Sequence, residues 1–273
     1  MNDQLKSILH FILQDHGIDL SKYEDLFLKK SVSKRMTDTF CETESTYFTY
    51  LENNQIEVDL LLKSLQISYT EFFRNTLTFS VLEKIIIPSL SLKKTNSKRN
   101  EIRIWSAACA GGQETYSLAM LLKEFTNGHG EKINFRIFAT DQSETQIHEA
   151  ESGFYPESAL NCLSMKRVKQ WFTNQGDIYS LKPELKENIE FSVFDLLNDK
   201  FSCPPTSIFG DFDLIVCANL LFYYKPEYQN KIIKKTTDCL SKNGYLVTGE
   251  TERELIMKAG LHEVYPQTGI FQF

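Results

Sequence analysis

The sequence is poor in the features that mark several large classes of protein. Its 273 residues contain no apolar run as long as the roughly 18 residues a membrane span needs, and MNDQLKSILHFILQDHG lacks the marks of a signal peptide. A net charge of −6 argues against nucleic-acid binding, because such proteins cluster Lys and Arg against phosphates. We therefore expect a cytoplasmic protein that binds no nucleic acid and does not insert into membranes.

Metal and disulfide patterns are equally scarce. No CxxC and no Cys/His pair at ligand spacing occurs among the six cysteines, which are Cys41, Cys109, Cys162, Cys203, Cys217 and Cys239. We expect reduced thiols, no disulfide framework and no bound metal. HExxH and Ser/His/Asp signatures are also missing, so the sequence does not indicate acid–base catalysis by histidine. Transfer of an already activated group needs mainly positioning and tolerates this absence.

The first 76 residues follow a helical pattern and contain no candidate strand. LKSILHFILQ and VDLLLKSLQI both place apolar residues at i, i+3, i+4 and i+7. We expect a helical domain over residues 1–76. A helix through VLEKIIIPSL, ended by Pro88, and the basic loop KKTNSKRN would then form a linker over residues 77–100.

From residue 101 to residue 273 short apolar runs alternate with helical segments. The candidate strands are IRIWS, NFRIFAT, IEFSVF, FDLIVCA and GYLVTG, and the candidate helices cover residues 116–125, 144–151, 164–172 and 226–240. This alternation predicts an α/β domain with a parallel sheet covered on both faces. A small β excursion is expected over about residues 171–191, and LHEVYPQTGIFQF suits an antiparallel hairpin at a sheet edge.

A run of small residues, Ala107 to Gly112, separates the first of these strands from an apolar helix in WSAACAGGQETYSLAM. Small residues let a ligand approach the backbone, and a helix start offers free N–H groups. The spacing Ser106-x-Ala108-x-Ala110-x-Gly112 is typical of a nucleotide-binding loop, but GxGxxG is absent. A tight strand-to-helix turn without a ligand would look similar, so both interpretations stay open.

Polar residues follow three further candidate strands, and in a parallel sheet the carboxyl ends of strands form the ligand site. They are Asp141, Asp195 and Asn219. Each is equally suited to cap the following helix, but their recurrence at successive strand ends favours a binding site. Asp141 stands further from Gly112 than the ~20 residues of the dinucleotide fingerprint, which argues against NAD.

Five blocks of the sequence occur in the order and at the spacing of a known family. They are TEFFR (70–74), WSAACAGGQETYSLA (105–119), ATD (139–141), FDLL (194–197) and CANLLFYY (217–224). With them the chain resembles the CheR-type chemotaxis receptor glutamate O-methyltransferases, which use S-adenosylmethionine. The resemblance implies a small all-helical N-terminal domain joined to a Rossmann-like class I methyltransferase domain. It also implies methyl transfer to glutamate carboxylates of receptors, with S-adenosylhomocysteine as the product.

The resemblance assigns site residues by matching positions. Its cofactor-binding set is Ser68, Thr70, Arg74, Glu114, Asp141, Asp195, Leu196, Ala218 and Asn219. In the family these positions hold the methionine portion (Glu114), the ribose (Asp141) and the adenine (Asp195 with Leu196). The implied catalytic set is Arg74, Asn219 and Tyr223, with Asn219 near the transferred methyl group and Tyr223 at the substrate entrance.

Two departures from the family pattern bear on activity. Gln113 stands where the family usually has a glutamate, and Ala218 stands where it usually has an arginine. A catalytically weakened module that binds the cofactor and regulates a signalling pathway is therefore the alternative to an active enzyme. An NAD-dependent oxidoreductase is disfavoured by the missing GxGxxG.

The expected partners are the cytoplasmic helices of methyl-accepting chemotaxis receptors, and we expect the protein to be a monomer. The basic residues Lys29, Lys30, Lys34 and Arg35 lie at spacings that share part of a helix surface. This surface either docks onto an acidic receptor helix or is an ordinary solvated face. Because the β excursion over residues 171–191 is short, we expect no tight binding of a receptor tail peptide.

Overall fold

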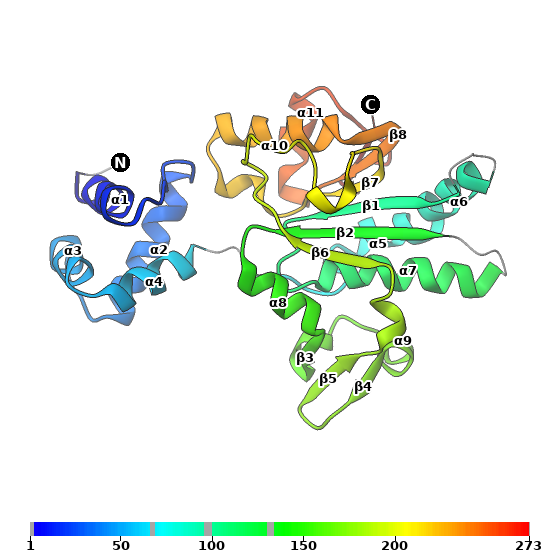
Figure 1. Cartoon of the computed structure of the whole chain (residues 1–273), viewed down its shortest axis with the longest axis horizontal. Helices are drawn as coiled ribbons and strands as arrows, with labels where there is room; N and C mark the ends of the chain where they lie inside the picture. Colours follow the sequence, from blue (N-terminus) through cyan, green and yellow to red (C-terminus); the bar gives the residue numbers. More distant parts are fainter. Residues whose placement is uncertain (1–2, 66–68, 96–99, 130–133, 273) are drawn as a thin grey trace. The chain divides into compact units, whose positions relative to one another are not determined.

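The chain divides into two units in a computed structural model, which describes residues 3–65, 69–95, 100–129 and 134–272 (Figure 1). The helical unit comprises Met1–Ile67 and Leu221–Gln229, and the sheet unit comprises Ser68–Leu220 and Asn230–Phe273. The chain passes from the first unit to the second before residue 76, where the sequence places the end of the helical domain. A short segment from far along the chain also joins the helical unit.

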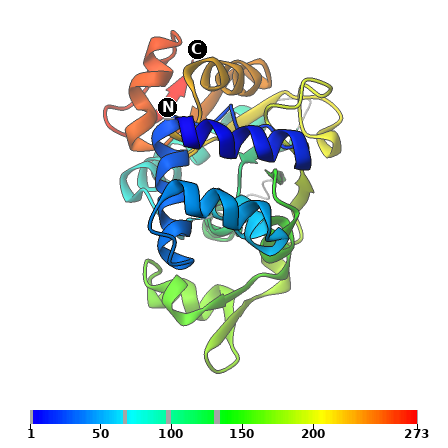
Figure 2. The ribbon, with the colours of Figure 1, turned by 90° about the vertical axis from the view of Figure 1, so that its left-hand side faces the viewer.

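Residues 3–65 of the helical unit form four helices, drawn in blue in Figure 2. They are α1 (Asp3–His16), α2 (Asp25–Asp38), α3 (Glu44–Glu52) and α4 (Gln55–Ser64). Thr43 begins α3 with a capping box, and the side chain of Asn54 accepts the Glu57 N–H at the start of α4. The apolar faces of these helices are buried in a common core, with Ile12 and Tyr47 fully covered.

An ion pair joins α2 to α4 inside this unit. The guanidinium of Arg35 donates from Nε to Glu57 Oε1 over 2.9 Å and from Nη2 to Glu57 Oε2 over 2.6 Å, and Tyr47 Oη donates to Oε1 over 2.8 Å. Arg35 is therefore half-buried and paired with Glu57, so its assignment to an exposed basic surface is wrong. Lys30 and Lys34 are exposed, as that assignment requires, and so is Lys29.

Residues 221–229 pack against the start of α2. The rings of Tyr23 and Tyr224 stack at a centroid distance of 5.1 Å, and the two residues form an isolated antiparallel bridge. The Glu24 N–H donates to the Tyr223 carbonyl over 2.9 Å. The predicted catalytic residue Tyr223 therefore lies in the helical unit.

A seven-stranded sheet forms the centre of the sheet unit, in the order β6-β2-β1-β7-β8-β10-β9. The strands are β1 (Ile102–Ala107), β2 (Phe135–Asp141), β6 (Ile189–Val193), β7 (Phe212–Val216), β8 (Leu240–Val247), β9 (His262–Glu263) and β10 (Ile270–Gln272). The first five are parallel and the last two pair antiparallel at the edge, so the predicted α/β architecture and terminal hairpin are confirmed. The winding reverses between β1 and β7, where such sheets bind ligands.

Helices cover both faces of this sheet. Figure 1 shows α7 (Gln113–His129) and α8 (Glu144–Ser152) below it, and α10 (Pro226–Asp238) and α11 (Arg253–Lys258) above it. All residues of β1 and β7 are buried, as expected for central parallel strands. No helix among the described residues combines the length and apolar character needed to cross a membrane.

A separate three-stranded sheet, the small sheet, stands at one end of the sheet unit in both views (Figures 1 and 2). It consists of β3 (Phe154–Pro156), β5 (Ile178–Leu181) and β4 (Phe172–Asn174), and the helix α9 (Met165–Trp171) leads into it. The β excursion expected over residues 171–191 contains β4 and β5. The strand β3 lies before that range and was not expected. Its three residues are too few to give a strand pattern in the sequence.

The expected end of a helix at Pro88 is wrong. The chain runs through α5 (Thr76–Val81), a π-helical turn (Leu82–Ile86) and α6 (Ile87–Thr95) without a break. A proline inside an α-helix removes an N–H and clashes with the preceding turn. The wider π turn directly before Pro88 relieves this clash, because its hydrogen bonds span five residues instead of four.

Candidate functional site

The loop between β1 and α7 has an unusual backbone. Ala108, Ala110 and Gly112 have φ values of 59°, 46° and 87°. Left-handed conformations cost a residue with a Cβ about 1–2 kcal/mol, and such strain concentrates at functional sites. Gly112 adopts this conformation without cost because it has no Cβ, whereas Ala108 and Ala110 are strained.

The carboxylate of Asp141, at the carboxyl end of β2, holds this loop in place. Its Oδ2 accepts the Ala110 N–H over 3.0 Å and its Oδ1 accepts the Ser143 N–H over 2.9 Å. Burial raises the pKa of Asp141, although the backbone hydrogen bonds oppose this shift. A third backbone N–H, that of Gln142, also lowers this pKa, so three donors use three of the roughly four acceptor positions and leave room for a hydrogen bond from a ligand.

The same loop packs closely on α8 and leaves one polar atom unsatisfied. A Cβ placed on Gly112 would lie 2.9 Å from the Cβ of Ala150, so a larger residue does not fit. The side-chain oxygen of Gln113 is buried and has no hydrogen-bond partner among the described residues. Buried acceptors are rarely left without a donor, so a ligand that supplies a donor fits this position.

Glu114, in the first turn of α7, is linked to the end of β1 by a chain of hydroxyl groups. Thr115 Oγ1 donates to Ser106 Oγ over 3.0 Å, and Ser106 Oγ donates to Glu114 Oε1 over 3.0 Å. Burial raises the pKa of Glu114 to about 7; the negative charge of Glu252 acts in the same direction, while the Ser106 hydrogen bond and the Arg74 charge oppose it. The carboxyl group is therefore poised to change charge near neutral pH.

The end of β7 is fixed by a carboxylate that the sequence analysis missed. Glu252 is fully buried, and its Oε2 accepts the N–H groups of Asn219 (2.8 Å) and Gly249 (2.9 Å) and the hydroxyl of Thr248 (2.9 Å). Its Oε1 accepts the Leu220 N–H over 2.7 Å. Asn219 has a φ of 60°, so this carboxylate holds a strained residue at the strand end.

The segment before α5 carries Thr70 and Arg74. The guanidinium of Arg74 lies 5.0 Å from the centre of the Tyr69 ring, and its Nη1 donates to the Tyr69 carbonyl over 3.1 Å. Tyr69 in turn donates to Glu71. Arg74 is exposed, and its charge reaches Glu114; Thr70 is half-buried and has no hydrogen bond to another described residue.

The remaining predicted residues fall into three groups. Asp195 and Leu196 follow β6, where Asp195 Oδ1 accepts the Leu197 N–H over 2.8 Å, and Ala218 follows β7 and packs against the core. The structure thus brings Glu114, Asp141, Asp195, Leu196, Ala218 and Asn219 to the carboxyl end of one sheet. Tyr223 lies in the helical unit, and Ser68 lies outside the described residues.

Two family models match the chain. The model described as the CheR methyltransferase, all-alpha domain, matches residues 3–65, and the one described as the CheR methyltransferase, SAM binding domain, matches residues 68–267. The boundary between them falls where the structure divides the chain.

Relatives are similar over most of the chain. A chemotaxis protein methyltransferase of Borreliella burgdorferi is 32% identical over 253 residues, which is 92% of this chain and 88% of that protein. A chemotaxis protein methyltransferase of Listeria innocua is 30% identical over 256 residues, 93% of this chain and 92% of that protein.

Replacing Glu252 should destabilise the protein. In Glu252→Gln the charge is lost and one side-chain oxygen becomes a donor, so a buried N–H loses its acceptor at a cost of about 2 kcal/mol. Urea denaturation followed by circular dichroism measures this loss. The control is Glu250→Gln, an exposed residue of the same turn, for which we expect a change within about 0.5 kcal/mol. Equal losses in both variants would contradict the structural role of Glu252.

Proposed function

The chain belongs to the CheR methyltransferase family and binds S-adenosylmethionine, and from this premise we propose that it methylates glutamate side chains of chemotaxis receptors. The products are glutamate methyl esters and S-adenosylhomocysteine. The observation that carries the proposal is the strained loop between β1 and α7, held by Asp141 beside Glu114. It makes a polar site with spare acceptors at the point where the sheet reverses its winding.

The residues at this site fit the cofactor. Asp141 has acceptor capacity left beyond its three backbone donors, which suits a hydroxyl group of the ribose. Glu114 and the unsatisfied oxygen of Gln113 suit the ammonium of the methionine portion, since both accept hydrogen bonds. Asp195 and Leu196, at the end of β6, are assigned to the adenine.

The proposed reaction needs little acid–base chemistry. S-adenosylmethionine supplies a methyl group on a positively charged sulfur, which is already a good leaving group. A receptor carboxylate forms the new bond to the methyl carbon as the bond from sulfur breaks, so no proton has to move. The task of the protein is to align the two groups and exclude water.

Three residues are assigned to the acceptor side of this site. The side chain of Arg74 is exposed and its guanidinium is planar, so it is suited to orient a carboxylate by two parallel hydrogen bonds. Asn219 is held by Glu252 at the end of β7, where it would face the transferred group. We also propose that Tyr223 acts at the substrate entrance.

The alternative of a catalytically weakened module is less well supported. It depends on Ala218, which replaces a positive charge by a methyl group, and on Gln113, which keeps hydrogen-bonding capacity without charge. The relatives from Borreliella burgdorferi and Listeria innocua, which match most of the chain, are named methyltransferases. If the chain binds S-adenosylhomocysteine but shows no turnover, and Ala218→Arg restores activity, the alternative is correct.

The direct test of the proposed function is receptor methylation. The full chain is incubated with methyl-labelled S-adenosylmethionine and cytoplasmic fragments of cognate receptors. We expect label that is released as methanol by mild base, because carboxyl methyl esters are base-labile and N-methyl groups are not. Failure with several cognate fragments, while the chain still binds S-adenosylhomocysteine, would contradict the proposal.

Cofactor binding should depend on pH through Glu114. A bound ammonium favours the ionised carboxylate, whereas the free protein holds the proton up to about pH 7, so binding expels this proton and tightens as pH rises. Between about pH 6 and about pH 8 the dissociation constant of S-adenosylhomocysteine should fall about tenfold. Calorimetry in buffers of different ionisation enthalpy measures the affinity and the proton release. The control Glu114→Gln should bind weakly at every pH, and a pH-independent wild type would refute the role of Glu114.

The exposed lysines of α2 are proposed to dock onto an acidic receptor helix. Lys30 and Lys34 form no ion pair with another described residue, so both charges are available to a partner. We expect the double variant Lys30→Glu/Lys34→Glu to reduce kcat/KM for a receptor fragment about fivefold at low salt, and less at high salt. The control is Lys63→Glu, which changes an exposed lysine of α4. Unchanged receptor methylation in the double variant would show that these lysines form an ordinary solvated surface and do not bind the receptor.

A further inference from the structure

Phe73, next to the predicted site residue Arg74, is held in a strained conformation. Its φ is 52°, a left-handed value that bulky residues rarely adopt. The preceding ring, Phe72, packs edge-on against Tyr155 and Phe172 of the small sheet, at centroid distances of 5.0 Å and 5.7 Å. The kink at Phe73 therefore lies between Phe72, which packs against the small sheet, and Arg74, whose charge acts on Glu114.

Three contacts hold Phe73 in this conformation. Its N–H donates to Ser117 Oγ on α7 over 3.0 Å, and its ring packs edge-on against Phe79 at 5.1 Å. The guanidinium carbon of Arg167 also lies over this ring, 4.2 Å from its centre. Phe73 is only 9% exposed, so this cation–π contact is sheltered from water and correspondingly strong.

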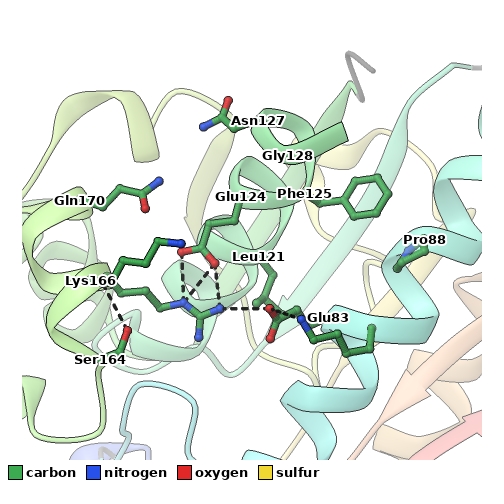
Figure 3. Close-up of a pocket in the computed structure, with 12 residues that line it drawn as sticks. Glu83, Pro88, Leu121, Glu124, Phe125, Asn127, Gly128, Ser164, Lys166 and Gln170 are labelled. Carbon is green, nitrogen blue, oxygen red and sulfur yellow. Dashed lines mark hydrogen bonds and ion pairs between the residues drawn. The ribbon is translucent and has the colours of Figure 1, made fainter. Parts of the chain in front are cut away.

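Arg167 is itself locked in place by charges from other elements. Its Nε and Nη2 donate to Glu124 of α7 over 3.1 Å and 2.8 Å, and its Nη2 lies 3.7 Å from Glu83. Trp171 also donates to Glu124, over 2.9 Å. Figure 3 shows Glu124 and Glu83 on either side of these interactions, along the wall of a cavity of roughly 680 Å³.

We propose that Arg167 is a positioning residue for the segment 70–74, and that it couples the small sheet to the cofactor site. Arg167 lies on α9, which leads directly into β4 of the small sheet. A shift of α9 would move the guanidinium from the Phe73 ring and release the strained kink that aims Arg74. The inference rests on the proposed function only in that it takes Arg74 to act at the site.

The choice of arginine is part of this inference. A planar guanidinium can stack its face on an aromatic ring while its edge donates two hydrogen bonds to a carboxylate. A lysine offers a single charged point and cannot do both. The conservative change Arg167→Lys should therefore fail to restore what Arg167→Gln loses.

The first test measures the segment itself and needs no enzymatic activity. We expect amide hydrogen exchange at Phe73 to become about tenfold faster in Arg167→Gln, because the contact that closes the kink is gone. Lys169→Gln, an exposed residue of the same helix, should leave this exchange unchanged. A lower melting temperature with unchanged exchange at Phe73 would give Arg167 a purely structural role and overturn the proposal.

The second test asks whether Arg167 acts through Arg74. The dissociation constant of S-adenosylhomocysteine and kcat/KM are measured for Arg167→Gln, Arg74→Ala and the double variant. If Arg167 works through Arg74, its replacement has little further effect once Arg74 is absent. Additive effects would overturn the proposal. Absence of methyl transfer by the wild-type chain would instead contradict the proposed function, and the exchange measurement would still decide this inference.

Discussion

Backbone N–H groups bound by buried carboxylates are the constraint on which the candidate site depends. Asp141 holds the loop after β1, and Glu252 holds the loop after β7, on the two sides of the point where the sheet reverses its winding. Both loops contain left-handed residues, so neither conformation would persist without a strong acceptor. The carboxylates supply it, because charge-assisted hydrogen bonds are about twice as strong as neutral ones.

The same carboxylates give the site its electrostatic character. Asp141, Glu114 and Glu252 gather around the carboxyl ends of the central strands, and burial raises the pKa of Asp141 and of Glu114. Buried carboxylates close to one another repel and are poorly solvated in the free protein. A cationic ligand lowers this electrostatic cost. S-adenosylmethionine carries its positive charges on the sulfonium and the ammonium, so the cost paid by the free protein favours this cofactor.

The sequence predicts local features better than distant ones. Alternating apolar runs located the central strands, and the small residues from Ala107 to Gly112 located the strained loop, because both signals lie within a few residues. The pairing of Arg35 with Glu57 was missed because Glu57 lies on another helix, 22 residues further along the chain. Glu252 was missed for the same reason, because Asn219 and Leu220, whose N–H groups it accepts, lie 33 and 32 residues earlier in the chain. The helix was wrongly expected to end at Pro88, because the π turn that accommodates this proline has no sequence signature.

A calorimetric titration of the full chain with S-adenosylhomocysteine, beside one with NADH, tests the central claim most directly. We expect one site for S-adenosylhomocysteine and no binding of NADH. The site should be lost in Asp141→Ala, because that variant removes both the anchor of the loop and an acceptor for the ligand. Binding of NADH in place of S-adenosylhomocysteine, or unchanged affinity for S-adenosylhomocysteine in Asp141→Ala, would contradict this claim.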